Sequence, residues 1–504
     1  MKFLKYLSCI VLGAVMLTSC GEDFTDAEVT AYLDGETATS LFESDPSALY
    51  NLVDGIYSWM VAFDVTGAAV HDDFSFMSVL HSTDMMGEDI ALAAAHWFNY
   101  DYLHDNSMFN YRRTLVNWLT FYTVITKSNE IMDMFVEFPE SSDSRGVFLA
   151  QAYAMRAFSY YYLIQLYQHP VKADGTPNLE APGVPMYYAN IDRALDETLT
   201  AELEETRKAR NTVADVYAQI ESDINYAIEL LDGYNRPSKN YVSQEVAYGI
   251  KARYCMLAQK WADAATAAKA AQAGGSLIAG LNDGFYDITS TEWMWGFDHN
   301  TETQTTYASF FSHISDLAPG YAGMAYSARL IDKKLYESIP ASDCRKAWFN
   351  GPEGNANAPQ PGAQLPYATL KFGNDGSWTM DYMYMRVAEM YLIEAEALAH
   401  QGEEAKAAAA IKPLMQARIA AWDKASMSVE EIYQQRRIEL WGEGFSYFDL
   451  KRLNKGINRA YDGNNHLPGF QLVVPPLANT WIYQIPRQEM QENAYLTEDD
   501  QNNF

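Results

Sequence analysis

The fold of this chain is decided by the stretch RRIELWGEGFSYFDLKRL at residues 436–453. Within it, Arg437, Glu439 and Glu443 stand at helical spacing, so their side chains can form ion pairs with one another and with neighbouring helices. The two glycines that flank Glu443 should end the first helix, and Asp449 can cap the next one. Because buried charges in proteins are paired, we interpret these residues as framework and not as ligand contacts.

Helical patterns continue upstream of this stretch. In residues 146–167, apolar side chains recur at steps of three and four, and Pro170 ends the pattern. A second helix is expected to begin at Thr212, where Asp215 completes a capping box, and a third after Ser243. These signals predict a mainly helical body.

The pattern of one predicted helix pair is repeated later in the sequence. The apolar and alanine positions of residues 247–268 recur in residues 388–409, with Gly402 in place of Trp261 at the turn. Two helices of this length, joined by a tight turn and carrying small residues where they cross, describe a tetratricopeptide-like unit. Such a unit cannot bury its apolar face alone, so several units must stack.

Two long stretches, residues 64–111 and 274–381, show no periodicity and are rich in Gly, Asn, Asp, Thr and aromatic residues. Loops of this length in a compact body are functional or disordered, and their aromatic content argues against disorder. Large rings lie close together in WFNY at 97–100 and in EWMWGFD at 292–298. Ring faces can stack on sugars while Asp and Asn side chains bond hydroxyl groups. Alternatively, the rings fix the loops to the helical body.

The composition excludes several classes of function. The chain has 36 Lys and Arg against 66 Asp and Glu, a net charge of −30, which argues against nucleic acid as a partner and suits solubility. No phosphate loop, dinucleotide fingerprint, nucleophile elbow or zinc-protease motif occurs, and the histidines lack metal-site spacing. We therefore expect no catalysis, cofactor or metal. Cys255 and Cys344 could form one disulfide, although Cys255 lies in an apolar helical pattern that suits burial.

The N-terminus has the pattern of a lipoprotein export signal. Lys2 and Lys5 precede a short apolar run at residues 7–17, which is too short to span a bilayer. Leu17-Thr18-Ser19-Cys20 then has the leucine and the cysteine of a lipobox. We expect residues 1–19 to be removed and Cys20 to carry diacylglycerol and acyl chains. A plain secretory signal that ends in cysteine is the alternative.

Three motifs resemble those of the SusD/RagB family, the surface nutrient-binding lipoproteins of Bacteroidetes, and they occur in the family's order. Residues 385–397, MRVAEMYLIEAEA, look like its R-x-A-E-x-x-L-x-x-A-E-A helix. Residues 436–453 resemble its R-R-x-E-L-x-x-E-G-x-R-x-x-D-L-x-R signature, although Ser446 stands where members often have Arg or His. Residues 485–490, IPRQEM, are similar to its I-P-x-x-E ending.

The resemblance implies an all-α fold, a SusD-like α/α superhelix with tetratricopeptide-like helix pairs and a loop-rich ligand-binding face. It divides the chain into the signal, a lipidated flexible tether at residues 20–41, and a body at residues 42–504. Within the body, a SusD-like N-terminal part is expected at about residues 42–275, and a RagB/SusD C-terminal part at about residues 276–504.

The resemblance also implies a function without catalysis. A member of this family captures oligo- or polysaccharide and delivers it to a SusC-like TonB-dependent outer-membrane transporter. The residues Gly21-Glu22-Asp23 look like an acidic surface-export signal, which implies a lipid anchor on the outer membrane that faces the outside of the cell. Two alternatives stay open, a peptide-binding RagB-like lipoprotein and a helical glycoside hydrolase.

Family binding sites draw aromatic residues from the two regions that match the long loops. The implied ligand contacts are three tryptophans and two polar partners. They are Trp97, Trp293, Trp295, Asp84 and Asn99.

Overall fold

The structure, a computed structural model, describes residues 49–136, 144–304 and 306–503. Cys20, the predicted export signal and the tether lie outside these residues. The helices are α3 (Leu49–Met60), α4 (Ser75–Met86), α5 (Asn99–Tyr102), α6 (Arg112–Asp133), α7 (Gly146–Tyr167), α8 (Asn190–Leu195), α9 (Ala201–Arg207), α10 (Val213–Leu230), α11 (Gln244–Leu257), α12 (Trp261–Ala271), α13 (Phe310–Ile314), α14 (Lys333–Ser338), α15 (Val387–His400), α16 (Glu404–Arg418), α17 (Val429–Glu439), α18 (Ser446–Arg452) and α19 (Arg487–Glu492). The strands are β1 (Ile90–Leu92), β2 (Trp293–Phe297), β3 (Arg329–Ile331), β4 (Tyr382–Arg386), β5 (Ile457–Asn458) and β6 (Val473–Val474).

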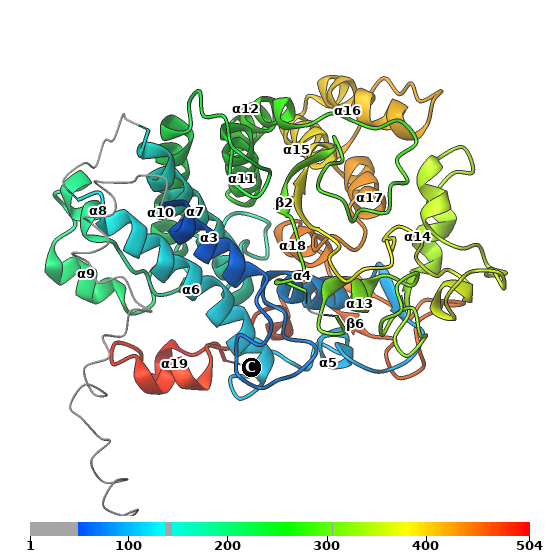
Figure 1. Cartoon of the computed structure of the whole chain (residues 1–504), viewed down its shortest axis with the longest axis horizontal. Helices are drawn as coiled ribbons and strands as arrows, with labels where there is room; N and C mark the ends of the chain where they lie inside the picture. The colour runs from blue at the N-terminus through cyan, green and yellow to red at the C-terminus, as the bar shows by residue number, and fades with distance from the viewer. Residues whose placement is uncertain (1–48, 137–143, 305, 504) are drawn as a thin grey trace, which may run out of the picture. The chain divides into compact units, whose positions relative to one another are not determined.

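The long helices pack on one another almost in chain order. Helix α6 packs on α7, α7 on α10, α10 on α11 and α11 on α12. The series continues from α12 to α15, and from α15 to α16 and α17, as Figure 1 shows across its left and upper parts. The strands form three two-stranded antiparallel sheets, β1 with β3, β2 with β4 and β5 with β6. The described part of the chain is therefore mainly helical, as the resemblance implied.

Helices with local start and stop signals lie where they were predicted. Helix α7 covers the expected residues 146–167. Helix α10 begins after Thr212, which forms the predicted capping box with Asp215. Ser243 caps α11 as expected. The two copies of the repeated pattern form the helix pairs α11–α12 and α15–α16, and α12 packs on α15.

The stretch predicted to be irregular at residues 64–111 contains helix α4, so this prediction was wrong. All twelve residues of α4 are buried, and therefore no amphipathic pattern marks it. Two of its polar side chains are satisfied inside the helix, since Ser82 and Thr83 donate to the carbonyl oxygen of Val79 at 2.9 Å and 3.0 Å. The second long stretch likewise contains β2, which pairs with β4.

The signature at residues 436–453 is framework, as predicted. Gly442 and Gly444 follow the end of α17 with φ of 76° and 89°. A Cβ on Gly444 would lie 2.7 Å from the Cβ of Leu80, so only glycine fits there. The predicted capping role of Asp449 was wrong. It lies inside α18, where its carboxylate accepts from Arg436 at 2.8 Å.

Glu439 is the centre of a buried ion network. Its carboxylate lies 2.7 Å from Arg386, 2.9 Å from Arg418 and 3.1 Å from Arg345. These arginines hold the pKa of Glu439 well below its ordinary value against the opposing effect of burial. The signature glutamate therefore pairs with arginines on three other segments and not with Arg437, its neighbour in the sequence.

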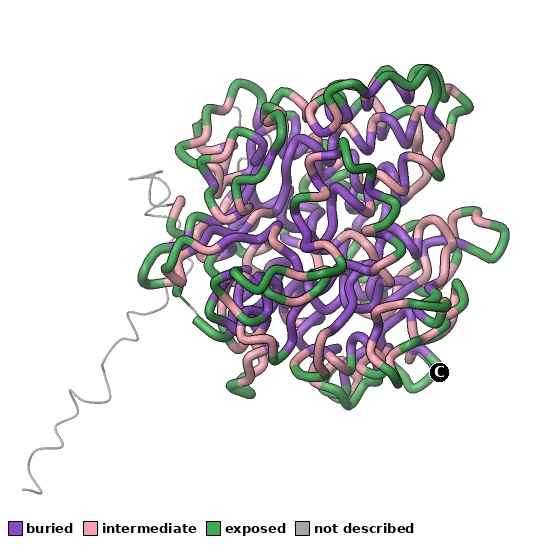
Figure 2. The backbone as a smooth tube through the Cα atoms, turned by 90° about the vertical axis from the view of Figure 1, so that its right-hand side faces the viewer, coloured by how far each residue is buried: buried purple, intermediate pink, exposed green. Residues whose placement is uncertain are grey.

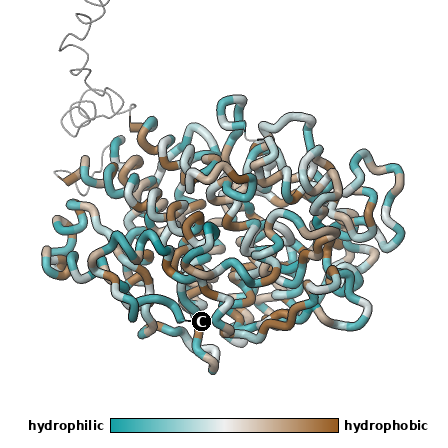
Figure 3. The backbone as a smooth tube through the Cα atoms, turned by 90° about the horizontal axis from the view of Figure 1, so that it is seen from below, coloured by the Kyte–Doolittle hydropathy of each residue, from teal (hydrophilic) through white to brown (hydrophobic). Residues whose placement is uncertain are grey.

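The core runs through the helical layers and beneath the loops, as the buried segments in Figure 2 show. Hydrophobic and hydrophilic segments alternate along the chain in Figure 3, as amphipathic helices require. Cys255 and Cys344 are both free, and Cys255 is buried as expected. In the ranges that the structure describes, no helix combines the length and the apolar content needed to cross a membrane.

Candidate functional site

Three of the five residues predicted to contact ligand lie in the core. Trp293 and Trp295 are 1% and 0% exposed in β2, and Trp295 Nε1 donates to the carbonyl oxygen of Asn240 at 3.0 Å. Asp84 is 3% exposed, and burial raises its pKa to about 7. As a correction to the prediction, we place these three residues in the framework, because none of them presents a surface to a ligand.

Trp97 lies in the loop between β1 and α5, Asn99 is the first residue of α5, and both are partly exposed. Phe98 between them has a left-handed backbone, with φ of 67°, and its side chain is buried. Its ring packs edge-on against His81 at 4.7 Å and His313 at 5.0 Å. Phe98 thus anchors the loop, while its two neighbours face outward.

Five aromatic side chains form a continuous row beside this loop, which we call the ring row. They are Trp378, Tyr307, Tyr321, His96 and Tyr326. Along the row, successive ring centroids are separated by 5.9, 5.7, 5.0 and 6.1 Å. Tyr307 is 41% exposed and Tyr326 is 58% exposed. Rings that merely filled the core would be covered, so the row is an accessible aromatic surface.

The ring row rests on His313 and His71. His313 stacks on Tyr321 at 5.0 Å, and its Nε2 donates to the carbonyl oxygen of His71 at 2.8 Å. His71 Nδ1 lies 2.8 Å from the hydroxyl of Tyr321, which fixes the direction of that ring. Burial holds the pKa of His313 well below its ordinary value, so His313 itself carries no positive charge near neutral pH.

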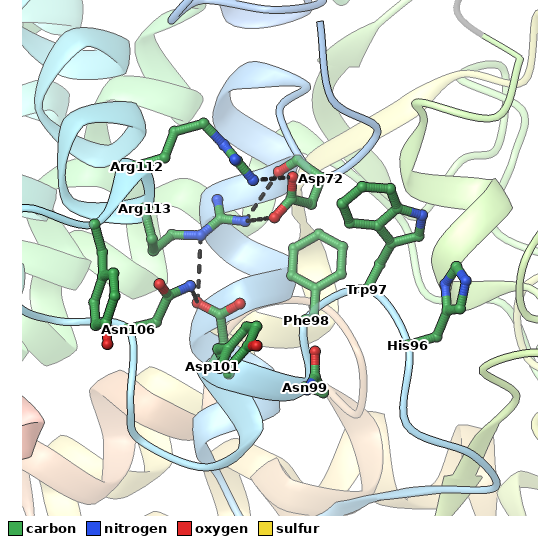
Figure 4. Close-up of a pocket in the computed structure, with 11 residues that line it drawn as sticks. Asp72, His96, Trp97, Phe98, Asn99, Asp101, Asn106, Arg112 and Arg113 are labelled. Atoms are coloured by element: carbon green, nitrogen blue, oxygen red, sulfur yellow. Dashed lines mark hydrogen bonds and ion pairs between the residues drawn. The ribbon is translucent and has the colours of Figure 1, made fainter. Parts of the chain in front are cut away.

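Trp97 connects the ring row to a pocket of about 600 Å³. Its ring centroid lies 6.2 Å from that of Tyr321, and its side chain also lines the pocket. Figure 4 shows Trp97 and His96 on one side of this pocket and Arg112 with Arg113 on the other.

The charged groups of the pocket are paired. Arg112 lies 2.6 Å from Asp72, and Arg113 Nε lies 3.3 Å from Asp101. Burial raises the pKa of Asp101 to about 6 although the Arg113 guanidinium opposes this shift. Two arginines face two carboxyl groups, so the pocket has no large excess of charge.

The geometry suits a ligand with flat apolar faces and many hydroxyl groups. Aromatic rings supply the stacking surface, and amide, phenol and guanidinium groups supply directed hydrogen bonds. The described residues contain no group of three or more His, Cys, Asp or Glu side chains arranged to hold a metal ion. The rings and the hydroxyl-binding groups of the site are suited to recognition of such a ligand.

The sequence reasoning missed most of the ring row. Tyr307, Tyr321, Tyr326 and Trp378 all lie in the long stretch 274–381, whose aromatic content was noted, but the prediction there went to Trp293 and Trp295. Those two stand in a dense aromatic run, and that run forms a buried strand. The useful signal would have been isolated rings among Gly, Ser and Ala, as in the segment GSWT at residues 376–379.

Two family models match the chain. One is described as the SusD family and matches residues 364–504, and the other is described as starch-binding associating with outer membrane and matches residues 32–256. None of the curated proteins matches.

Several solved structures are similar over nearly the whole chain. A SusD-like carbohydrate binding protein from Bacteroides vulgatus is 25% identical, with a TM-score of 0.76 over 91% of this chain and 98% of that one. A SusD superfamily protein from Bacteroides thetaiotaomicron is 18% identical, with a TM-score of 0.71 over 91% of this chain and 100% of that one. Surface glycan-binding protein A from the same organism is 16% identical, with a TM-score of 0.65 over 91% of this chain and 99% of that one.

Proposed function

This chain belongs to the SusD/RagB family, and we propose from that premise that it binds a glycan on the ring row at the outer membrane. The description of one matching family, starch-binding associating with outer membrane, supports both parts of the proposal. The similar structures named as carbohydrate-binding and glycan-binding proteins support the ligand class.

The observation that carries the proposal is the exposed, continuous row of rings. Its members come from three separate segments, at residues 96, 307–326 and 378, and the fold brings them into contact. Several ring faces in sequence suit a ligand with several sugar rings better than a single monosaccharide, because each sugar can stack on its own aromatic partner. Trp97 extends the surface toward the pocket and stays part of the proposed site.

We propose that the bound glycan is released to a SusC-like TonB-dependent transporter and not degraded. Glycoside hydrolysis needs two carboxyl groups that flank the scissile bond. The pocket beside the row holds Asp72 and Asp101, and arginines engage both of them. The partner and the lipid on Cys20, with exposure at the cell surface, belong to the same proposal and follow from the lipobox and the family resemblance.

The test is a screen for binding of polysaccharides and peptides to the mature chain. This chain starts at residue 20, where serine replaces Cys20 so that no lipid is attached. We expect saturable binding to one class of glycan without products. Tyr307→Ala and Tyr326→Ala should each weaken it about tenfold, since stacking contributes roughly 1–1.5 kcal/mol. Tyr495→Ala is the matched control, because Tyr495 is similarly exposed at 42% but lies against Glu205.

Three results would contradict the proposal. If both ring-row variants bind as tightly as the parent, the ring row is not the site. If sugar products accumulate, the chain is a hydrolase. Selective binding of peptides would instead favour the RagB-like alternative.

A further inference from the structure

The pocket beside Trp97 lies to the side of the ring row and not at its end. From Tyr321 the rings continue in two directions, to His96 at 5.0 Å and to Trp97 at 6.2 Å. The first direction leads on to Tyr326, which is 58% exposed. A glycan chain on the row can therefore pass from Tyr307 to Tyr326 without ending at Trp97, and the pocket opens laterally from that path.

The pocket offers several polar groups that have no partner among the residues that the structure describes. The amide of Asn99 and the Oδ1 atom of Asn106 form no hydrogen bond with another described residue, and the same holds for the hydroxyls of Tyr100 and Tyr111. Asn99 and Asn106 are partly exposed, while the two tyrosines are exposed. Each of these groups can donate to or accept from a sugar hydroxyl.

The pocket also has the size and the charge balance for a neutral sugar. Its volume of about 600 Å³ lies inside the range of roughly 300–1,000 Å³ typical of small-molecule sites. Its charged side chains pair as Arg112 with Asp72 and Arg113 with Asp101, so no unpaired charge calls for an ionic ligand. Trp97 forms one wall and offers an aromatic surface for a sugar ring.

We infer that this pocket receives a neutral side branch of the glycan whose main chain lies on the ring row. The substrate class is thus a branched polysaccharide, and the pocket distinguishes it from its linear backbone. This inference rests on the proposed function, because it needs a main chain on the row. Trp97 has a positioning role between the two parts, since it contacts the row on one side and the pocket on the other.

The test compares branched polysaccharides with matched linear backbones. Suitable pairs are galactomannan and mannan, arabinoxylan and xylan, amylopectin and amylose, and xyloglucan and cellulose oligosaccharides. By titration calorimetry on the mature chain, we expect at least one branched member to bind about tenfold more tightly than its backbone, because two or three added hydrogen bonds give roughly that gain.

Two variants of Asn99 make the test specific to the pocket. Asn99→Trp obstructs part of the pocket and should remove the preference for the branched member while the affinity for the linear backbone changes by less than about twofold. Asn99→Ala removes only the amide and should reduce the preference partly. The Asn99 side chain forms no hydrogen bond with another described residue and is partly exposed. We therefore expect both variants to fold, and their melting temperatures check this.

The outcomes separate this inference from the proposed function. Equal affinity for the branched and linear members of every pair would overturn the inference and leave glycan binding intact. The inference would also be overturned if the folded Asn99→Trp variant lost affinity for both the branched and the linear polysaccharide. The pocket would then not act on the branch alone. Absence of binding to every glycan would overturn the proposed function, and the inference with it.

Discussion

Asp84 accepts a hydrogen bond from the backbone N–H of Gly444 at 2.7 Å, although the two residues are 360 positions apart. Its second oxygen accepts from the N–H of Ser446 at 3.1 Å. The contact joins helix α4 to the signature turn between α17 and α18, and α4 also carries His81 beneath the anchoring ring of Phe98. The family signature thus helps to support the loop of the candidate site from a distance.

Replacement of Asp84 by alanine should destabilise the fold. The variant leaves the buried N–H of Gly444 and the partly buried N–H of Ser446 without an acceptor, and we expect a loss of about 3 kcal/mol in the free energy of unfolding. Urea denaturation measures this, with Asp462→Ala as the control, because Asp462 is exposed. A loss similar to that of the control would mean that the contact does not stabilise the turn.

The same carboxyl group should make stability depend on pH. Burial raises the pKa of Asp84 to about 7, whereas an unfolded chain has about 3.9. Between these values the folded state keeps a proton that the unfolded state has lost, so the contribution of Asp84 to stability falls as pH rises, by at most about 1.4 kcal/mol per pH unit. The stability of the parent relative to Asp84→Asn should therefore be greatest near pH 4 and smallest above pH 7. A difference that stays constant, or grows with pH, would refute this assignment.

Glu439→Gln should be among the most damaging single changes in the chain. It removes the charge that Arg345, Arg386 and Arg418 share in the core, and an uncompensated buried charge costs roughly 3–5 kcal/mol. Glu404→Gln, at an exposed position of α16, is the matched control and should change the free energy of unfolding by less than about 0.5 kcal/mol. Equal melting temperatures for the two variants would show that the ion network is dispensable.

Local chemistry explains which parts of the fold were predictable. Thr212 and Asp215 lie three residues apart, so their capping box can be read from the sequence, and α10 begins where they predict. Helix α4 has no such signal, because it is buried on all sides. The site is harder to predict, since Trp97 and Trp293 both stand in aromatic runs. The pairing of β2 with β4, which joins distant residues, buries Trp293, whereas Trp97 lies in a loop and is partly exposed.

Two replacements of Trp97 should separate its ring from its N–H group. The Nε1 atom is buried and has no hydrogen-bond partner among the described residues, so Trp97→Phe should keep most of the affinity for glycan. Trp97→Ala removes the stacking surface and should weaken binding by about tenfold. Titration calorimetry measures the glycan affinity of both variants, after their melting temperatures have shown that they fold. Equal losses in both would assign the effect to the N–H group and not to the ring.

Glycan affinity should depend little on salt, even though the chain has a net charge of −30. The charges nearest the ligand cancel, since Arg112 pairs with Asp72 and Arg113 with Asp101, and the histidine beneath the ring row is neutral near pH 7. We therefore expect less than about a twofold change in affinity between roughly 50 and 500 mM NaCl, although the Debye length falls severalfold over that range. A basic peptide attracted by the acidic surface would lose affinity over the same range, and an oligolysine titration serves as the positive control. A steep loss of glycan affinity with rising salt would contradict this prediction. It would show that charged groups of the ligand contribute to binding, although the charges of the pocket are balanced.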